Sequence, residues 1–119
     1  MSTTDLDTLK NQLREFADAR DWNQFHSPKN LAMALSVEAA EIVEHFQWLT
    51  EEQSSNLPQK KHDEVEAELA DTFIYLIRLA DKLDIDLLSA TERKIVHNDE
   101  KYPVEKARGN ATKYSDFDK

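Results

Sequence analysis

The sequence predicts an all-α protein, built as a four-helix bundle, and three observations lead to this fold class. The 119 residues include one glycine and three prolines, two residue types that are unfavourable inside helices. Apolar residues recur at helical spacing in several segments, and the connections between these segments are short. The length is that of one domain, so we expect a single domain over residues 1–119.

The first two helices are expected at about residues 5–18 and 28–49. In the first, apolar side chains are spaced three or four residues apart, at Leu6, Leu9, Leu13 and Phe16. This is the period of an amphipathic helix. Ser27 and Pro28 have the residue types preferred at the N-cap and the first position of the second helix. The second helix is apolar almost all around at its start, which predicts that it is buried.

The remaining elements are a polar loop, two helices and an irregular tail, expected at about residues 50–61, 60–83, 86–102 and 103–119. The loop contains Pro58, and Asp86 is an N-cap candidate for the fourth helix. Pro103 ends that helix because proline cannot continue it.

Composition excludes several classes of protein. Without cysteine there is no disulfide, thiolate nucleophile or iron–sulfur site, and a single glycine cannot form a glycine-rich phosphate-binding loop. Twenty-four acidic and 15 basic side chains give a net charge of −9, which argues against binding nucleic acid. We find no apolar run near the roughly 20 residues of a membrane span and no signal-peptide pattern. We therefore expect a cytoplasmic protein with no membrane partner, and a thin core that self-association completes.

Two of the expected helices carry carboxylates where apolar residues would be expected. On the second helix, Glu38 and Glu41 are three residues apart, so both lie on one face. On the third helix, Glu68 and Asp71 are placed in the same way. Burying unpaired like charges costs several kcal/mol each unless a cation offsets them. Because an all-oxygen ligand set suits Mg²⁺, Mn²⁺ or Ca²⁺ rather than zinc, the four acids predict a divalent metal site.

Two other interpretations of acidic pairs are relevant here. Such pairs commonly lie on solvated helix faces, and we interpret the acids of residues 51–52 and 64–66 in that way because their surroundings are polar. A di-iron carboxylate bundle requires two Glu-x-x-His motifs, whereas the residues three after Glu38, Glu41 and Glu68 are all acidic. The di-iron interpretation therefore fails on spacing.

Basic and aromatic side chains supply what a nucleoside polyphosphate needs. Lys94 and Asn98 are four residues apart on the fourth helix, and the tail adds Arg108; such groups suit phosphate and sugar oxygens. Flat side chains able to stack on a base lie near helix ends, at Trp22, Phe25, His26 and Trp48. Trp48, seven residues after Glu41, is expected on the same helix face. A solvated basic face and ordinary packing aromatics are the simpler alternatives.

These motifs, in this order, resemble the MazG-like family of all-α nucleoside triphosphate pyrophosphatases, and within it the dCTP pyrophosphatase branch. The acidic pairs match the family's ExxE…ExxD signature, with 26 residues between Glu41 and Glu68. Further matching segments are residues 21–26, 46–48, 74–76, 94–103 and 108–114. The resemblance extends from about Leu13 to Tyr114, and the whole set is far more specific than the signature alone.

The resemblance implies roles for the matched residues. The ligands of Mg²⁺, or of Mn²⁺ as a substitute, would be Glu38, Glu41, Glu68 and Asp71. The base pocket would be lined by Trp22, Phe25, His26 and Trp48. Sugar and phosphates would be contacted by Tyr75, Lys94, Asn98 and Arg108. Members of the family are typically homodimers or homotetramers with sites at subunit interfaces. This chain departs from close relatives at Leu13, where they place a histidine in the substrate pocket.

The expected reaction is hydrolysis of a (deoxy)nucleoside triphosphate, above all dCTP or a modified dCTP, to the monophosphate and pyrophosphate. Water would attack the α-phosphorus, Glu41 or Glu44 would accept its proton, and Lys94 would stabilise the departing pyrophosphate. Two alternatives stay open: a phosphoribosyl-ATP or dUTP-type pyrophosphohydrolase, and a helical regulatory module that binds nucleotide or metal without turnover. The four intact acids favour an enzyme.

Overall fold

The computed structural model describes residues 4–118, and the regular elements of this part of the chain are all helical. Lys119, the last residue of the predicted tail, lies outside the described residues. The chain divides into two compact units, of which the first extends to Ile85 and the second begins at Asp86.

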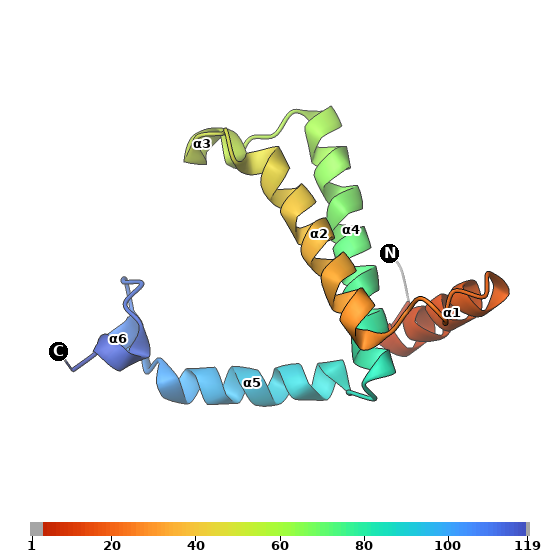
Figure 1. The fold of residues 1–119 in the computed structure, drawn as a ribbon. Helices are drawn as coiled ribbons and strands as arrows, with labels where there is room; N and C mark the ends of the chain where they lie inside the picture. Colours follow the sequence, from red (N-terminus) through yellow and green to blue (C-terminus); the bar gives the residue numbers. More distant parts are fainter. Residues whose placement is uncertain (1–3, 119) are drawn as a thin grey trace. The chain divides into compact units, whose positions relative to one another are not determined.

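The first unit is built on a pair of long helices. Its elements are α1 (Leu6–Ala19), α2 (Pro28–Phe46), α3 (Glu51–Ser54) and α4 (Gln59–Lys82). Helices α2 and α4 pack side by side along most of their length, and α1 packs against α4 (Figure 1). This pairing brings the faces of α2 and α4 that carry the predicted metal ligands together.

The starts of the first two helices follow their capping residues. The Asp5 carboxylate accepts a hydrogen bond from Thr8 N (2.8 Å), and Ser27 Oγ accepts one from Asn30 N (3.1 Å). Ser27 is thus the predicted N-cap of α2. Helix α1 ends where Asp21 takes a left-handed conformation (φ 53°), which aspartate tolerates better than most residues. The chain then turns back, and the loop between α1 and α2 reaches α4.

Two predicted boundaries in this unit are wrong. Helix α2 ends at Phe46 rather than near residue 49, and the predicted loop contains the short helix α3. The cause is a capping box: Thr50 N donates to Gln53 Oε1 (2.9 Å), and Gln53 N donates to Thr50 Oγ1 (3.1 Å). Each side chain satisfies a backbone donor of the other residue, so a new helix starts there.

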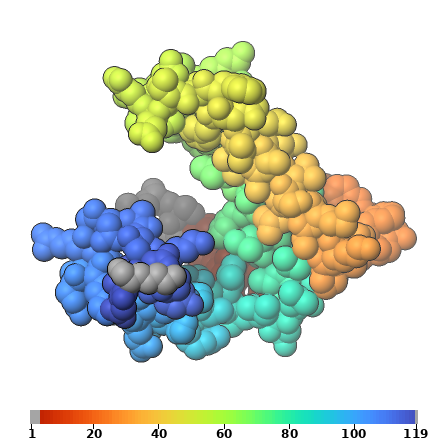
Figure 2. Space-filling model, turned by 60° about the vertical axis from the view of Figure 1, so that its left-hand side comes forward, coloured from red at the N-terminus to blue at the C-terminus, as the bar shows by residue number. Residues whose placement is uncertain are grey.

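The core of the first unit is thin. Its buried apolar side chains are Ala17, Leu31, Val65, Ile77 and Ala80. The prediction that α2 is buried is wrong within this unit, because Met33 and Val37 are 58% and 57% exposed. One face of α2 packs on α4, and its outer side is left uncovered by the rest of the first unit, as Figure 2 shows from orange to yellow.

The second unit contains α5 (Leu87–Lys101), α6 (Val104–Ala107) and the 3₁₀-helix η1 (Tyr114–Asp116). Asp86 is the predicted N-cap of α5 and accepts a hydrogen bond from Ser89 N (3.1 Å). The prediction of an irregular tail is wrong over α6 and η1. The Tyr102 ring, at the end of α5, packs edge-on against Tyr114 and Phe117 of the tail, with ring centroids 6.0 and 5.7 Å apart. No helix within residues 4–118 is long and apolar enough to cross a membrane.

Candidate functional site

Three of the four predicted acids meet where α2 packs against α4. Carboxylate oxygens of Glu38, Glu41 and Glu68 lie within 4.8 Å of one another, and all three side chains are partly buried. Glu38 and Glu41 share one face of α2, and Glu68 comes from α4. Glu38 Oε2 and Glu68 Oε2 are buried without a hydrogen-bond partner among residues 4–118. Because such acceptors are rare in folded proteins, these two oxygens are candidates for binding a ligand.

Crowding within the acidic cluster raises the pKa of two carboxyls. The pKa of Glu38 rises to about 7, first through burial and then through hydrogen bonding with Glu41 and repulsion from its charge. The pKa of Glu68 is raised first by hydrogen bonding with Glu41 and then by burial. Asp71 adds its repulsion to both groups. A nearby cation would reverse these effects because it favours the charged form of each acid.

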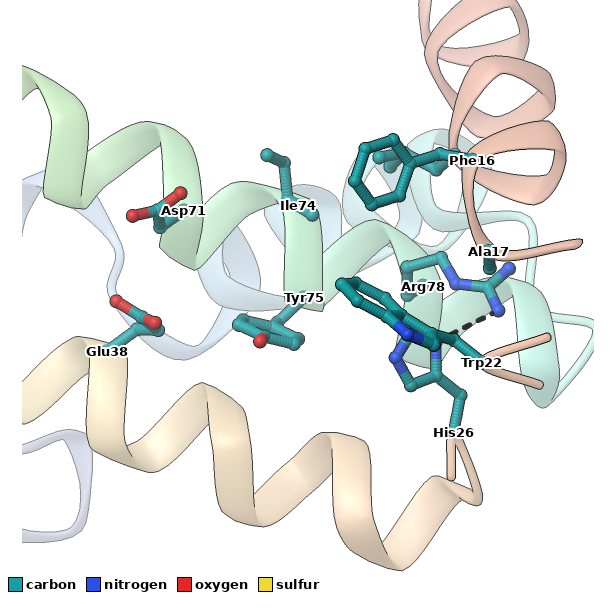
Figure 3. A pocket seen from close by; sticks show the side chains of 10 residues that line it. Phe16, Ala17, Trp22, His26, Glu38, Asp71, Ile74, Tyr75 and Arg78 are labelled. Atoms are coloured by element: carbon teal, nitrogen blue, oxygen red, sulfur yellow. Dashed lines mark hydrogen bonds between the residues drawn. The ribbon is translucent and has the colours of Figure 1, made fainter. Parts of the chain in front are cut away.

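A cavity of about 350 Å³ begins beside the acidic cluster and runs along α4 (Figure 3). At one end, the carboxylates of Glu38 and Asp71 point toward each other from α2 and α4. The middle of the cavity is mostly apolar or aromatic and is lined by Leu13, Phe16, Ala17, Trp22, Ile74 and Tyr75. An apolar slot with a few polar groups at its ends is the usual form of a small-molecule site.

The other end of the cavity is formed by Arg78 and His26 (Figure 3). Arg78 projects from α4 and is only 4% exposed. Its Nη2 donates hydrogen bonds to Asn23 Oδ1 (3.0 Å) and His26 Nδ1 (3.2 Å), whereas its buried Nε has no partner among the described residues. The pKa of His26 is lowered, first by burial and then by the positive charges of Arg78 and Lys82. His26 is therefore neutral near pH 7.

A polar network joins Arg78 to α1 and to the loop that follows it. Asp81, three residues after Arg78, accepts two hydrogen bonds from Arg14 of α1, at 2.7 Å from Nε and 2.5 Å from Nη2. Asp81 also forms an ion pair with Arg78 Nη1 at 3.8 Å. The Arg14 hydrogen bonds hold the pKa of Asp81 below its ordinary value. On the loop side, the Asn23 amide donates to Asp18, so the groups around Arg78 are themselves held in place.

Comparison with known proteins identifies the family. The model of the MazG-like family matches residues 33–117. The chain belongs to the MazG-like family. It is 41% identical over 114 residues to dCTP pyrophosphatase 1 from Mus musculus and 37% identical over 116 residues to dCTP pyrophosphatase 1 from Homo sapiens. Both matches cover 94% of this chain and 67% of the relative. The resemblance inferred from the sequence is thereby confirmed.

A solved structure supports the fold of this MazG-like chain. A pyrophosphatase from Archaeoglobus fulgidus is 39% identical and matches it with a TM-score of 0.79. The match covers 87% of this chain and 96% of the other. The all-α class predicted from the sequence is confirmed.

Several predicted site residues of the MazG-like chain come together in the first unit. The cavity is lined by five of them: Trp22, His26, Glu38, Asp71 and Tyr75. Glu41 and Glu68 join Glu38 in the acidic cluster. Asp71 is not among the acids whose oxygens lie within 4.8 Å of one another. It lines the cavity beside this cluster.

Other predicted residues lie outside this cavity. Phe25 is 59% exposed and Trp48 is 86% exposed, and neither lines it. The expectation that Trp48 shares a helix face with Glu41 is wrong, because α2 ends at Phe46. The remaining candidates belong to the second unit, and their roles stay predictions: Lys94, Asn98 and Arg108.

Arg78 is the site residue that sequence reasoning missed. It stands in the apolar second half of the third predicted helix, between Ile77 and Leu79. A charge in such a position is costly unless hydrogen bonds satisfy it, so its surroundings were a usable signal. The sequence did not show which residues hydrogen-bond to Arg78, because Asn23 and His26 are 55 and 52 residues away.

The acidic cluster fits a divalent cation. All of its donor atoms are carboxylate oxygens, the ligand type of Mg²⁺, Mn²⁺ and Ca²⁺, and nitrogen or sulfur ligands typical of zinc are absent from this group. The buried Oε2 atoms of Glu38 and Glu68, which have no partner within residues 4–118, give an independent reason, because a cation would satisfy both.

Proposed function

We propose that this chain is a Mg²⁺-dependent pyrophosphohydrolase that converts dCTP, or a modified dCTP, to the monophosphate and pyrophosphate. The observation that carries the proposal is the buried Oε2 of Glu38, which has no hydrogen-bond partner among the described residues and belongs to a carboxylate at one end of an apolar cavity. Relatives named dCTP pyrophosphatase 1 and a structural neighbour named pyrophosphatase support the reaction. Hydrolysis breaks the bond between the α-phosphorus and the oxygen that bridges to the β-phosphorus, and water supplies the new oxygen.

The two ends of the cavity would bind different parts of the substrate, the triphosphate at the acidic end and the base toward Arg78. Glu38, Glu41, Glu68 and Asp71 would hold Mg²⁺, and an anionic triphosphate cannot approach this end without it. When bound, Mg²⁺ would neutralise charge that develops on the phosphates and would make water a stronger nucleophile. The base then extends along the apolar walls toward Arg78, with Trp22 and Tyr75 beside it.

Proton transfer requires a carboxylate near the attacking water. Glu41 and Glu44 are both candidates, since they lie one turn apart on α2. Glu41 is part of the acidic cluster, whereas Glu44 is exposed. The two are separable by experiment: a Glu44→Gln variant that loses turnover but binds Mg²⁺ normally would identify Glu44 as the base. A Glu44→Gln variant with normal turnover would leave Glu41.

We assign the second unit to the phosphates and the leaving group. Lys94 is the candidate that stabilises the departing pyrophosphate, and Asn98 and Arg108 are the candidates for sugar and phosphate oxygens. All three lie on helix α5 or directly after α6. Lysine and arginine are suited to this role because they neutralise phosphate oxygens as they gain charge.

The active protein is proposed to be a homodimer or homotetramer. The thin core and the exposed apolar side chains along α2, such as Met33, Val37 and Val43, support this assembly. Sedimentation of the purified chain tests it, because a monomer at micromolar concentration would contradict the proposal.

One panel of substrates tests the reaction. The purified full chain is incubated with Mg²⁺ and each NTP and dNTP, and pyrophosphate and orthophosphate are measured separately. We expect pyrophosphate, with dCTP or a modified dCTP as the best substrate. Release of orthophosphate alone would show cleavage of a different bond. No product from any nucleotide would favour a binding module, and a preference for dUTP would favour the related dUTP-type enzyme.

A further inference from the structure

The hydrogen bond between Arg78 and His26 determines which nitrogen of the imidazole carries the proton. A guanidinium group has donors only, so His26 Nδ1, at 3.2 Å from Arg78 Nη2, must accept. An accepting Nδ1 has no proton, and a neutral ring then carries its proton on Nε2. Burial and the nearby positive charges disfavour a second proton on this ring.

The Nε2–H group of His26 is free to bind a ligand. His26 lines the cavity, and no residue in the described part of the chain accepts a hydrogen bond from its Nε2. Trp22 packs edge-on against the ring, with centroids 6.1 Å apart, and limits its orientation. Arg78, at the same end, has only donors, and its Nε has no partner within residues 4–118. His26 and Arg78 therefore both present hydrogen-bond donors at this end of the cavity.

The acidic cluster at the opposite end decides which part of a nucleotide meets these donors. Metal and phosphates belong beside Glu38 and Asp71, so the base reaches toward His26 and Arg78 (Figure 3). Pyrimidine bases differ in whether the ring atom N3 accepts or donates a hydrogen bond. Cytosine presents two adjacent acceptors, N3 and O2, whereas uracil and thymine carry a hydrogen on N3. A donor facing N3 is satisfied by cytosine and opposed by the other two bases.

We propose that His26 determines specificity by donating from Nε2 to the acceptor edge of cytosine, and that Arg78 is the positioning residue that holds this tautomer. The inference rests on the proposed function for the orientation of the nucleotide. Neither the tautomer nor the role of Arg78 depends on turnover, because both are properties of the free protein.

The first experiment measures the tautomer directly. Long-range ¹H–¹⁵N correlation spectra of the full chain, without nucleotide, distinguish protonated from unprotonated ring nitrogens. We expect His26 with the proton on Nε2, and we expect Arg78→Lys to keep it because lysine also donates. Arg78→Met removes the donor and should produce a mixture of tautomers. A proton on Nδ1 in the wild-type protein would overturn the proposal.

The second experiment measures specificity as the ratio of kcat/KM for dCTP to kcat/KM for dUTP. His26→Leu removes both ring nitrogens and should lower this ratio roughly tenfold through KM, the effect of losing about one hydrogen bond. His26→Gln keeps a donor and an acceptor and should retain most of the preference. His62→Leu is the matched control, since His62 is an exposed histidine on α4. An unchanged ratio in folded His26→Leu, or a wild-type protein with no preference, would refute the role of His26.

Failure of this inference is distinguishable from failure of the proposed function. If the wild-type protein releases no pyrophosphate from any nucleotide, the proposed function fails. The affinities of the free protein for dCMP and dUMP, followed by the same spectra, then decide the role of His26. If dCTP is hydrolysed and the His26→Leu ratio is unchanged, the proposed function stands and only the further inference fails. Should Arg78→Met not fold, the two His26 variants still give both answers.

Discussion

The two ends of the cavity differ in how their charged groups are satisfied. At the acidic end, two buried carboxylate oxygens have no hydrogen-bond partner among residues 4–118, and burial together with hydrogen bonding to Glu41 raises the pKa of Glu38 and Glu68. At the other end, Arg78 is held by Asn23, His26 and Asp81, and the pKa of Asp81 is lowered. Like charges are therefore crowded at the acidic end, whereas hydrogen bonds and an ion pair satisfy the charged groups at the Arg78 end. Function and stability can therefore be separated by testing the two ends independently.

The largest effect is expected from neutralising the acidic end. Glu41→Gln and Asp71→Asn each remove one negative charge from the proposed metal ligands, and turnover of dCTP should fall at least about a hundredfold at saturating Mg²⁺. The fold should survive, because the change relieves repulsion between like charges. Pyrophosphate release and circular dichroism measure the two outcomes.

Glu52→Gln is the control for these variants. Glu52 is an exposed acid on α3, so its neutralisation changes net charge by the same amount without touching the cavity. Full activity in both Glu41→Gln and Asp71→Asn would show that these acids do not hold the metal.

The next largest effect concerns the pH dependence of folding stability, which Mg²⁺ should reverse. An acid with a raised pKa keeps its proton in the folded protein at pH values where the unfolded chain has lost it. The metal-free protein should therefore lose stability as the pH rises from about 4.5 to about 7, the two pKa values of Glu38. Mg²⁺ favours the ionised acids, so its stabilising effect should grow across the same interval. We expect a Tm increase of about 5 °C at pH 8 and almost none at pH 5.

The Glu41→Gln variant sharpens this experiment. Without Glu41 the repulsion at Glu38 is smaller, so the metal-free variant should melt at a higher temperature than the wild type at pH 8 and respond weakly to Mg²⁺. A Mg²⁺-induced rise in Tm that is the same at pH 5 and pH 8 would argue that the cation binds elsewhere.

The Arg78 end should show the opposite pH dependence and a moderate effect on stability. Asp81 has a lowered pKa, so its contribution is present above about 3.8 and disappears as the pH falls through the lower, folded-state value. Asp81→Asn weakens its bonds to Arg14 and Arg78 and should reduce the free energy of unfolding by about 1–2 kcal/mol, since Arg14 is half-exposed. Denaturant unfolding at pH 7 measures this loss of free energy. The Mg²⁺-induced rise in Tm is expected to be unchanged in this variant. No loss of stability would mean that the network only orders the loop.

Local features of the fold were predictable, and contacts distant in sequence were not. Ser27, Pro28 and Asp86 marked helix starts that the structure contains, because capping depends on neighbouring residues. The paired acids were predictable for the same reason, since a spacing of three residues defines a helix face. Which acids come within 4.8 Å, and that Asp71 lies at the cluster's edge, depend on how α2 packs on α4. Arg78 was missed because its hydrogen bonds to Asn23 and His26 join residues more than 50 apart in sequence.

The smallest effect in the series concerns the two tryptophans, which the sequence placed in one base pocket. Trp22 lines the cavity and packs edge-on against Phe16 at 5.5 Å, so Trp22→Ala should raise KM for dCTP about tenfold with little change in kcat. Trp48 lies beyond the end of α2 and is 86% exposed, so it reaches a base only if the assembled protein brings it there. In the proposed oligomer, Trp48→Ala should raise KM about fivefold, the lower end of a stacking contribution. Steady-state kinetics at a protein concentration where the oligomer is intact decide the point: an unchanged KM in Trp48→Ala would confine the base to the cavity of the first unit.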